Sequence, residues 1–173
     1  MIDGMWEDIK RSWTSGSMLY RLIWVNVVVF VLVNAALIVT KLGGIELSVG
    51  LGDCFGLATT SDVDVLMRRP WSVFTHMFAH TAILHLVFNM ILLWWMGSMY
   101  QAEVGSRRLL STYLTGGLAG FLFYILAFNL LPGLSAQITP DTVPFALGSS
   151  AAVLSIFTAA ATLNPNRKVR FIL

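Results

Sequence analysis

Three hydrogen-bonding side chains stand out because they lie in stretches that are otherwise apolar. His85 and Asn89 are four residues apart in a long apolar stretch, so a helix would stack them on one face. Ser150 follows Gly148 at the start of another apolar, alanine-rich stretch. Polar groups within hydrocarbon are costly and usually functional. Two donors on one helix and a serine at the mouth of another indicate a nucleophile with an oxyanion hole.

The composition indicates that this chain lies in a lipid bilayer. Its 173 residues are 57% hydrophobic and 12% charged, with a mean hydropathy of +0.76. Soluble domains are about 45–50% apolar and about 25% charged. The single cysteine, Cys54, cannot form an internal disulfide, and the few basic residues lie at helix ends, which predicts no nucleic-acid binding. We expect an all-α, polytopic membrane protein with one domain.

Four apolar segments predict four transmembrane helices. Three of them, over residues 22–40, about 81–100 and about 109–130, approach the ~20 residues that a bilayer requires. The fourth, over residues 150–163, reaches only ~21 Å of a hydrocarbon core that is ~30 Å thick. Ser150 is therefore expected roughly 9 Å below one membrane surface, at the bottom of a water-accessible pit.

The segments outside these helices have distinct compositions. Residues 1–19 mix charges with large apolar side chains at helical spacing, which predicts an interfacial helix, with a disordered tail as the alternative. Residues 20–173 form the transmembrane domain. Within it, we expect residues 41–70 to lie partly in the membrane interface, residues 101–108 to form a polar turn, and the proline-containing residues 131–147 to form a loop.

The distribution of positive charge predicts the orientation. In a four-helix arrangement, three basic residues fall on one side and eight on the other, the eight being Lys10, Arg11, Arg21, Arg107, Arg108, Arg167, Lys168 and Arg170. The larger group is expected in the cytoplasm, together with the N-terminus. The second and fourth helices then both begin at the outer side. This topology predicts that His85, Asn89 and Ser150 share one depth.

Other polar and small residues in the helices have structural interpretations. Asn26 and Asn34 are expected to form hydrogen bonds between helices, and His85 taken alone has the same interpretation. The pattern Gly116-x-x-x-Gly120 permits close contact between helices. These residues are predicted to pack the bundle.

Two further features have a chemical and a structural interpretation. Ser149 and Ser150 suit the N-cap of a helix, and Ser150 can serve as both cap and nucleophile. His76 and His80 are four residues apart, as in a zinc-binding helix, but Met77 occupies the position where such a site has its glutamate base. We therefore predict neither a metal nor a cofactor.

The two candidate motifs together resemble the rhomboid family of intramembrane serine proteases. They are His80-x4-His85-x3-Asn89, and Gly148-x-Ser150 at the head of a short alanine-rich helix. The segment from Trp71 to His80 also resembles the family's approach to its second helix. The likeness extends over roughly residues 20–173. It implies a rhomboid-like bundle of six transmembrane helices, of which this chain holds four, in a bacterial inner membrane.

The resemblance also implies a role for each candidate residue. Ser150 would be the nucleophile of a Ser-His dyad, and its backbone N–H would form the oxyanion hole with the side chains of His85 and Asn89. Gly148 would let the backbone bend before the nucleophile, and His80 matches a position with a supporting, structural role. The implied substrates are transmembrane helices of other membrane proteins.

The sequence departs from the family pattern at three positions of minor consequence. Ser72 follows Trp71 where the family usually has arginine, and Gln101 stands where a glutamate is expected. Ala151 follows the nucleophile where glycine is common. Another small residue at this position still allows close packing.

A fourth departure concerns the general base. Family members place a base histidine on a sixth helix, whereas the three histidines of this chain all lie close to its second helix and the sequence ends at Leu173. A serine hydroxyl is a weak nucleophile without a base. We expect a truncated protease whose C-terminal helices, or a partner, supply the histidine. The alternative is a catalytically inactive rhomboid-like protein that binds membrane helices.

Overall fold

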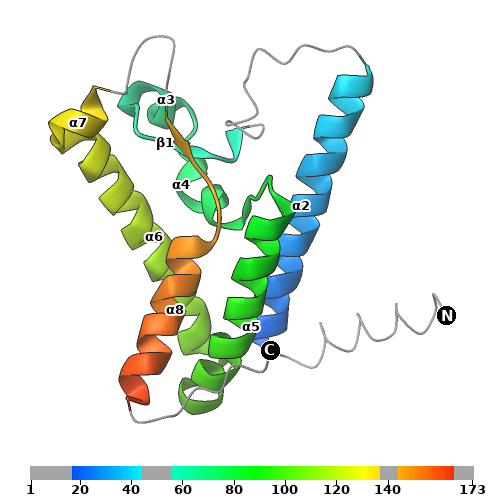
Figure 1. The fold of residues 1–173 in the computed structure, drawn as a ribbon, viewed down its shortest axis with the longest axis vertical. Coiled ribbons are helices and arrows are strands. Elements are labelled where there is room, and N and C mark those ends of the chain that lie inside the picture. The colour runs from blue at the N-terminus through cyan, green and yellow to red at the C-terminus, as the bar shows by residue number, and fades with distance from the viewer. Residues whose placement is uncertain (1–16, 44–55, 137–143, 166–173) are drawn as a thin grey trace.

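The computed structural model describes residues 17–43, 56–136 and 144–165. Among these residues, three helices are long and apolar enough to cross a membrane, namely α2 (Met18–Leu42), α5 (Ile83–Val104) and α6 (Ser106–Leu130). A shorter apolar helix, α8 (Ser150–Leu163), has 14 residues. The chain is thus an integral membrane protein built as a helical bundle, which confirms the predicted fold class (Figure 1).

Three of the four helices depart from their predicted bounds at their first residues, and α2 and α5 also end later than predicted. α8 has the predicted bounds, whereas α2 and α6 begin a few residues earlier and α5 begins at Ile83 instead of about residue 81. α5 begins late because Ala82 is extended, with φ −98° and ψ 128°, so His80 precedes the helix. The interfacial helix predicted over residues 1–19 lies outside the described residues, apart from its last three positions.

The polar turn predicted over residues 101–108 is reduced to Gly105, whose φ is 84°. α5 continues to this glycine, and the amide of Gln101 has its partners at the start of α2. Its Oε1 accepts a hydrogen bond from the backbone N–H of Leu19 at 3.0 Å, and its Nε2 donates to Ser17 Oγ at 3.1 Å. The first N–H groups of a helix have no partner within it. Gln101 therefore caps the start of α2.

Short elements gather at the end of the bundle where the site lies (Figure 1). They are α3 (Val63–Arg68), α4 (Ser72–Thr75), the 3-10 turn η2 (His76–Phe78), α7 (Pro132–Ser135) and the strands β1 (Thr59–Thr60) and β2 (Phe145–Ala146). The strands pair antiparallel, with Thr59 opposite Ala146. The loop predicted over residues 131–147 thus contains α7 and β2. The strand pair joins the segment just before α8, which contains β2, to the segment between α2 and α3, which contains β1.

The helix α8 packs against both α5 and α6. Its inward face is fully buried, with Val153, Ile156 and Ala160 in a core that also contains Leu93 and Leu109. α8 begins part-way along the bundle, below the upper ends of α2 and α6 in Figure 1. This arrangement agrees with the recessed position that the length of the helix predicts for its first residue.

The two asparagines of α2 have different partners. Asn26 forms the predicted bond between helices, because its Nδ2 donates to the hydroxyl of Tyr113 in α6 at 3.1 Å. Asn34 Nδ2 instead donates to the carbonyl of Phe30 in its own helix at 2.9 Å, so the prediction is wrong for this residue. The upper part of α2 extends past the start of α5 (Figure 1).

Close contact between α6 and α8 depends on two glycines. A Cβ atom at Gly116 would overlap the side chain of Ser155, and one at Gly120 would overlap the Cβ of Ala151. The close approach lets Ser155 Oγ donate to the carbonyl of Thr112 at 2.9 Å. The helix contact predicted from the glycine spacing is confirmed.

Gly116→Ala is expected to lower the free energy of unfolding by about 1–3 kcal/mol, the usual cost of overpacking a core. The added methyl group would push Ser155 away and break its bond to Thr112. Unfolding in detergent, followed by circular dichroism, measures the change. The control is Gly133→Ala, because nothing lies within 4 Å of a Cβ atom there. Equal stability of the two variants would contradict the close contact.

Candidate active site

Ser150 is the first residue of α8, and a tight bend precedes it. Gly148 has φ 119°, a region that side chains other than glycine rarely adopt. A Cβ atom at Gly148 would also lie 2.6 Å from Cε1 of His85. Glycine is therefore required twice, for its backbone conformation and for the space that the imidazole ring occupies.

The side chains of His85 and Asn89 meet Ser150, although 61 or more residues separate them in the sequence. His85 Nε2 lies 2.8 Å from Ser150 Oγ. Asn89 Nδ2 donates to the same oxygen at 3.4 Å and to the carbonyl of His85 at 2.8 Å. Asn89 is buried, whereas His85 and Ser150 are half-buried. The three side chains form one cluster that a second molecule can reach.

The short contact between His85 and Ser150 has two proton arrangements. A neutral imidazole without a proton on Nε2 accepts a hydrogen bond from the serine hydroxyl, as a general base does. An imidazole that carries this proton donates to Oγ, as an oxyanion-hole residue does. Asn89 can only donate through Nδ2 in both cases. When Nε2 of His85 has no proton, the cluster offers one acceptor, His85, and one donor, Asn89. When Nε2 carries a proton, both side chains are donors.

His80 holds the residue before the nucleophile. Its Nε2 accepts a hydrogen bond from the backbone N–H of Ser149 at 3.2 Å and lies 3.2 Å from the hydroxyl of the same residue. Burial, with a smaller contribution from the nearby ring of His85, lowers the pKa of His80 to about 4. His80 is therefore neutral at pH 7, as an acceptor must be. The Ser149 hydroxyl makes no N-cap bond, because its partner is His80.

His76 contributes through its backbone, which sequence reasoning missed. The carbonyl of His76 accepts a hydrogen bond from the N–H of Gly148 at 2.8 Å, and its ring Nδ1 lies 3.0 Å from the carbonyl of Ser72. Its spacing from His80 was the only signal in the sequence. A backbone acceptor leaves no trace in residue type, so this contact could not be found from the sequence.

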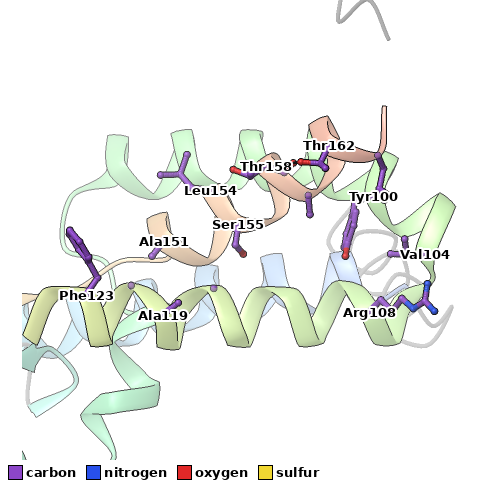
Figure 2. A pocket seen from close by; sticks show the side chains of 14 residues that line it. Tyr100, Val104, Arg108, Ala119, Phe123, Ala151, Leu154, Ser155, Thr158 and Thr162 are labelled. Carbon is purple, nitrogen blue, oxygen red and sulfur yellow. Dashed lines mark hydrogen bonds between the residues drawn. The ribbon is translucent and has the colours of Figure 1, made fainter. Parts of the chain in front are cut away.

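A groove runs along α8 from Ala151, the residue that follows Ser150, and its lining does not include His85, Asn89 or Ser150. It has a volume of about 840 Å³ and lies between α6 and α8, with Phe123 and Ala151 at one end and Arg108 at the other (Figure 2). Small residues form much of its wall, among them Gly116, Ala119, Gly120, Ser155 and Ala159. A groove of this shape and composition suits an apolar helix.

Comparison with known proteins agrees with this architecture. A model of the Rhomboid domain matches residues 67–172. Similar proteins include the Rhomboid protease GlpG of Salmonella newport (strain SL254), Salmonella heidelberg (strain SL476) and Salmonella agona (strain SL483). Each is 29% identical over 86 residues, which cover 40% of this chain and 31% of the relative. The match therefore spans about a third of the length of these relatives.

Proposed function

This chain belongs to the rhomboid family, and from that premise we propose that it is an intramembrane serine endopeptidase that cleaves transmembrane helices of membrane-protein substrates. The observation that carries the proposal is the cluster of Ser150 with His85 and Asn89 inside an apolar helical bundle. Polar groups are rarely placed in such surroundings without a functional role.

The proposed reaction begins with attack of Ser150 Oγ on the carbonyl carbon of a substrate peptide bond. The hydroxyl proton passes to a base, and the carbonyl oxygen becomes negatively charged. His85, Asn89 and the backbone N–H of Ser150 donate to this oxygen, and one such donor typically contributes about 3–4 kcal/mol. The leaving amine takes up a proton, and water then hydrolyses the acyl-enzyme.

The base is proposed to be a histidine from outside these 173 residues, contributed by further helices or by a partner. The resemblance assigns His85 to the oxyanion hole, and the other two histidines are used elsewhere, His80 with Ser149 and His76 with Ser72. The groove between α6 and α8 supports this proposal, because it can receive a helix that packs against α8, the helix whose first residue is Ser150 (Figure 2). We also propose a bacterial inner membrane, which the resemblance implies, and a cytoplasmic N-terminus, which the distribution of positive charge predicts.

A second candidate function is that of a catalytically inactive rhomboid-like protein that binds membrane helices. It is favoured by the same groove between α6 and α8, whose small lining residues can receive an apolar helix. In this function Ser150 would hold the donor cluster together without reacting.

Treatment with a fluorophosphonate separates the two functions. The native gene product is isolated from its own membranes after treatment, and its intact mass is measured. The protease is expected to carry one adduct, located on Ser150 by peptide mapping, because only an activated serine attacks the reagent. Heat-denatured protein is the control and is expected to carry none. A native protein that binds a transmembrane peptide but forms no adduct would favour the inactive helix-binding function.

A further inference from the structure

Tyr113 is a fully buried tyrosine in α6 whose hydroxyl joins three elements. The hydroxyl donates to the carbonyl of Met77 in η2 at 2.9 Å. It accepts a hydrogen bond from Asn26 Nδ2 in α2 at 3.1 Å, and Asn26 is also fully buried. The second N–H of this amide donates to the carbonyl of Leu22 at 2.8 Å. The tyrosine hydroxyl thus connects α2, α6 and η2 inside the bundle.

The surroundings of Tyr113 hold η2 in one place. Its ring stacks on that of Phe78, with 5.6 Å between the ring centres and 28° between the planes. On the same helix, a Cβ atom at Gly117 would lie 2.8 Å from Cε of Met77, so Met77 packs directly against the α6 backbone. A buried polar group without a partner is costly, and the Tyr113 hydroxyl supplies the partner of the Met77 carbonyl. α6 therefore holds η2 in place through both apolar and polar contacts.

The turn that Tyr113 holds is also the one that fixes the start of α8. The carbonyl of His76, next to Met77, accepts from the N–H of Gly148 at 2.8 Å. His80, at the end of the same segment, accepts from the N–H of Ser149 at 3.2 Å. These two bonds hold the backbone immediately before Ser150. A continuous series of contacts therefore leads from α2 through Tyr113 to the nucleophile position.

From this series we infer that Tyr113, oriented by Asn26, is a positioning residue that keeps Ser150 Oγ against His85 and Asn89 by anchoring η2. Tyr113 touches no reacting atom and acts through the neighbours of its hydroxyl, chiefly the carbonyl of Met77 and also the side chain of Ser149. The relevance of Tyr113 to catalysis rests on the proposed function of Ser150. The effect of Tyr113 on the position of the Ser150 side chain does not depend on that function. Without the hydroxyl, the Met77 carbonyl loses its partner and η2 can shift together with the backbone before Ser150.

The test uses a thiol as a reporter of this position. Ser150→Cys is introduced together with Cys54→Ser, which removes the only native cysteine, and the rate of alkylation by iodoacetamide is measured in detergent at pH 8. Tyr113→Phe is then added. The thiolate is the reactive form, and the donors of His85 and Asn89 favour it. We expect alkylation to become about fivefold slower, the factor that corresponds to the loss of one ordinary hydrogen bond.

A matched control separates positioning from a general loss of stability. Tyr100 is also a buried tyrosine, and its hydroxyl pairs with Thr112 Oγ1 at 2.9 Å, away from η2. Tyr100→Phe is expected to lower the melting temperature through the loss of this one bond and to leave the alkylation rate unchanged. A rate for Tyr113→Phe that equals or exceeds the rate for Tyr100→Phe would overturn the inference. Because the assay needs no general base, failure of the proposed protease function would leave its outcome unaffected.

Discussion

Ser150→Ala is expected to abolish cleavage of a transmembrane substrate, with a loss of at least ~10⁴-fold in kcat, as for removal of the nucleophile in serine proteases. The substitution removes the only atom that can form the acyl-enzyme in the proposed reaction. It should leave the fold intact, because Ser150 is half-buried and alanine favours a helix. Cleavage of a fluorescent transmembrane substrate in proteoliposomes, with circular dichroism of the same sample, measures both effects.

Ser149→Ala is the matched control for this prediction. It removes the same hydroxyl one residue earlier, where the partner of the hydroxyl is His80 instead of His85. The backbone N–H of Ser149 still reaches His80 in this variant, so the bend before the nucleophile is preserved and cleavage should persist. Retained cleavage by Ser150→Ala, or its loss only in Ser149→Ala, would remove Ser150 from the role of nucleophile.

Much of the fold could be predicted because the bilayer imposes simple rules on a sequence. Backbone groups must be satisfied within each spanning segment, so long uncharged stretches become helices. The bounds of α8 are those expected from its run of apolar residues between Gly148 and Asn164. The spacing of His85 and Asn89 placed them on one helix face, and both meet Ser150. The shared depth of the three residues followed from topology alone.

The parts that could not be predicted depend on contacts that residue types do not encode. Gln101 caps α2, and α5 continues through a stretch whose polarity is typical of a turn. The carbonyls of His76 and Met77 bind Gly148 and Tyr113, and every residue has such a carbonyl. The groove along α8 depends on the separation between two helices, which no single stretch of sequence determines.

The cluster around Ser150 is built before any substrate arrives. Asn89 Nδ2 already donates to the backbone carbonyl of His85 at 2.8 Å, which fixes the amide relative to the backbone of α5. His85 in turn occupies the space that the missing side chain of Gly148 leaves free. Donors held in advance need no reorganisation when charge develops, and this property gives an oxyanion hole most of its effect. His85 is therefore the residue whose removal should be most costly after that of Ser150.

His85→Ala is expected to lower kcat by about 10²–10³-fold with little change in KM, the behaviour of a donor that acts mainly in the transition state. His85→Gln keeps an N–H donor but has no basic nitrogen, so part of the activity should return. Initial rates on the fluorescent transmembrane substrate provide both constants. Labelling by the fluorophosphonate should slow in each variant and still reach one adduct.

The pair of variants also decides between the two proton arrangements of the 2.8 Å contact between His85 and Ser150. If His85 were the base, glutamine could not replace it, and both variants would lose labelling altogether. Asn89→Ala provides the comparison, because Asn89 donates to Ser150 at the longer distance of 3.4 Å and has no basic form. Its loss should reduce kcat by about tenfold and spare labelling. Partial rescue by His85→Gln, beside this milder effect, would identify His85 as a donor and locate the base elsewhere.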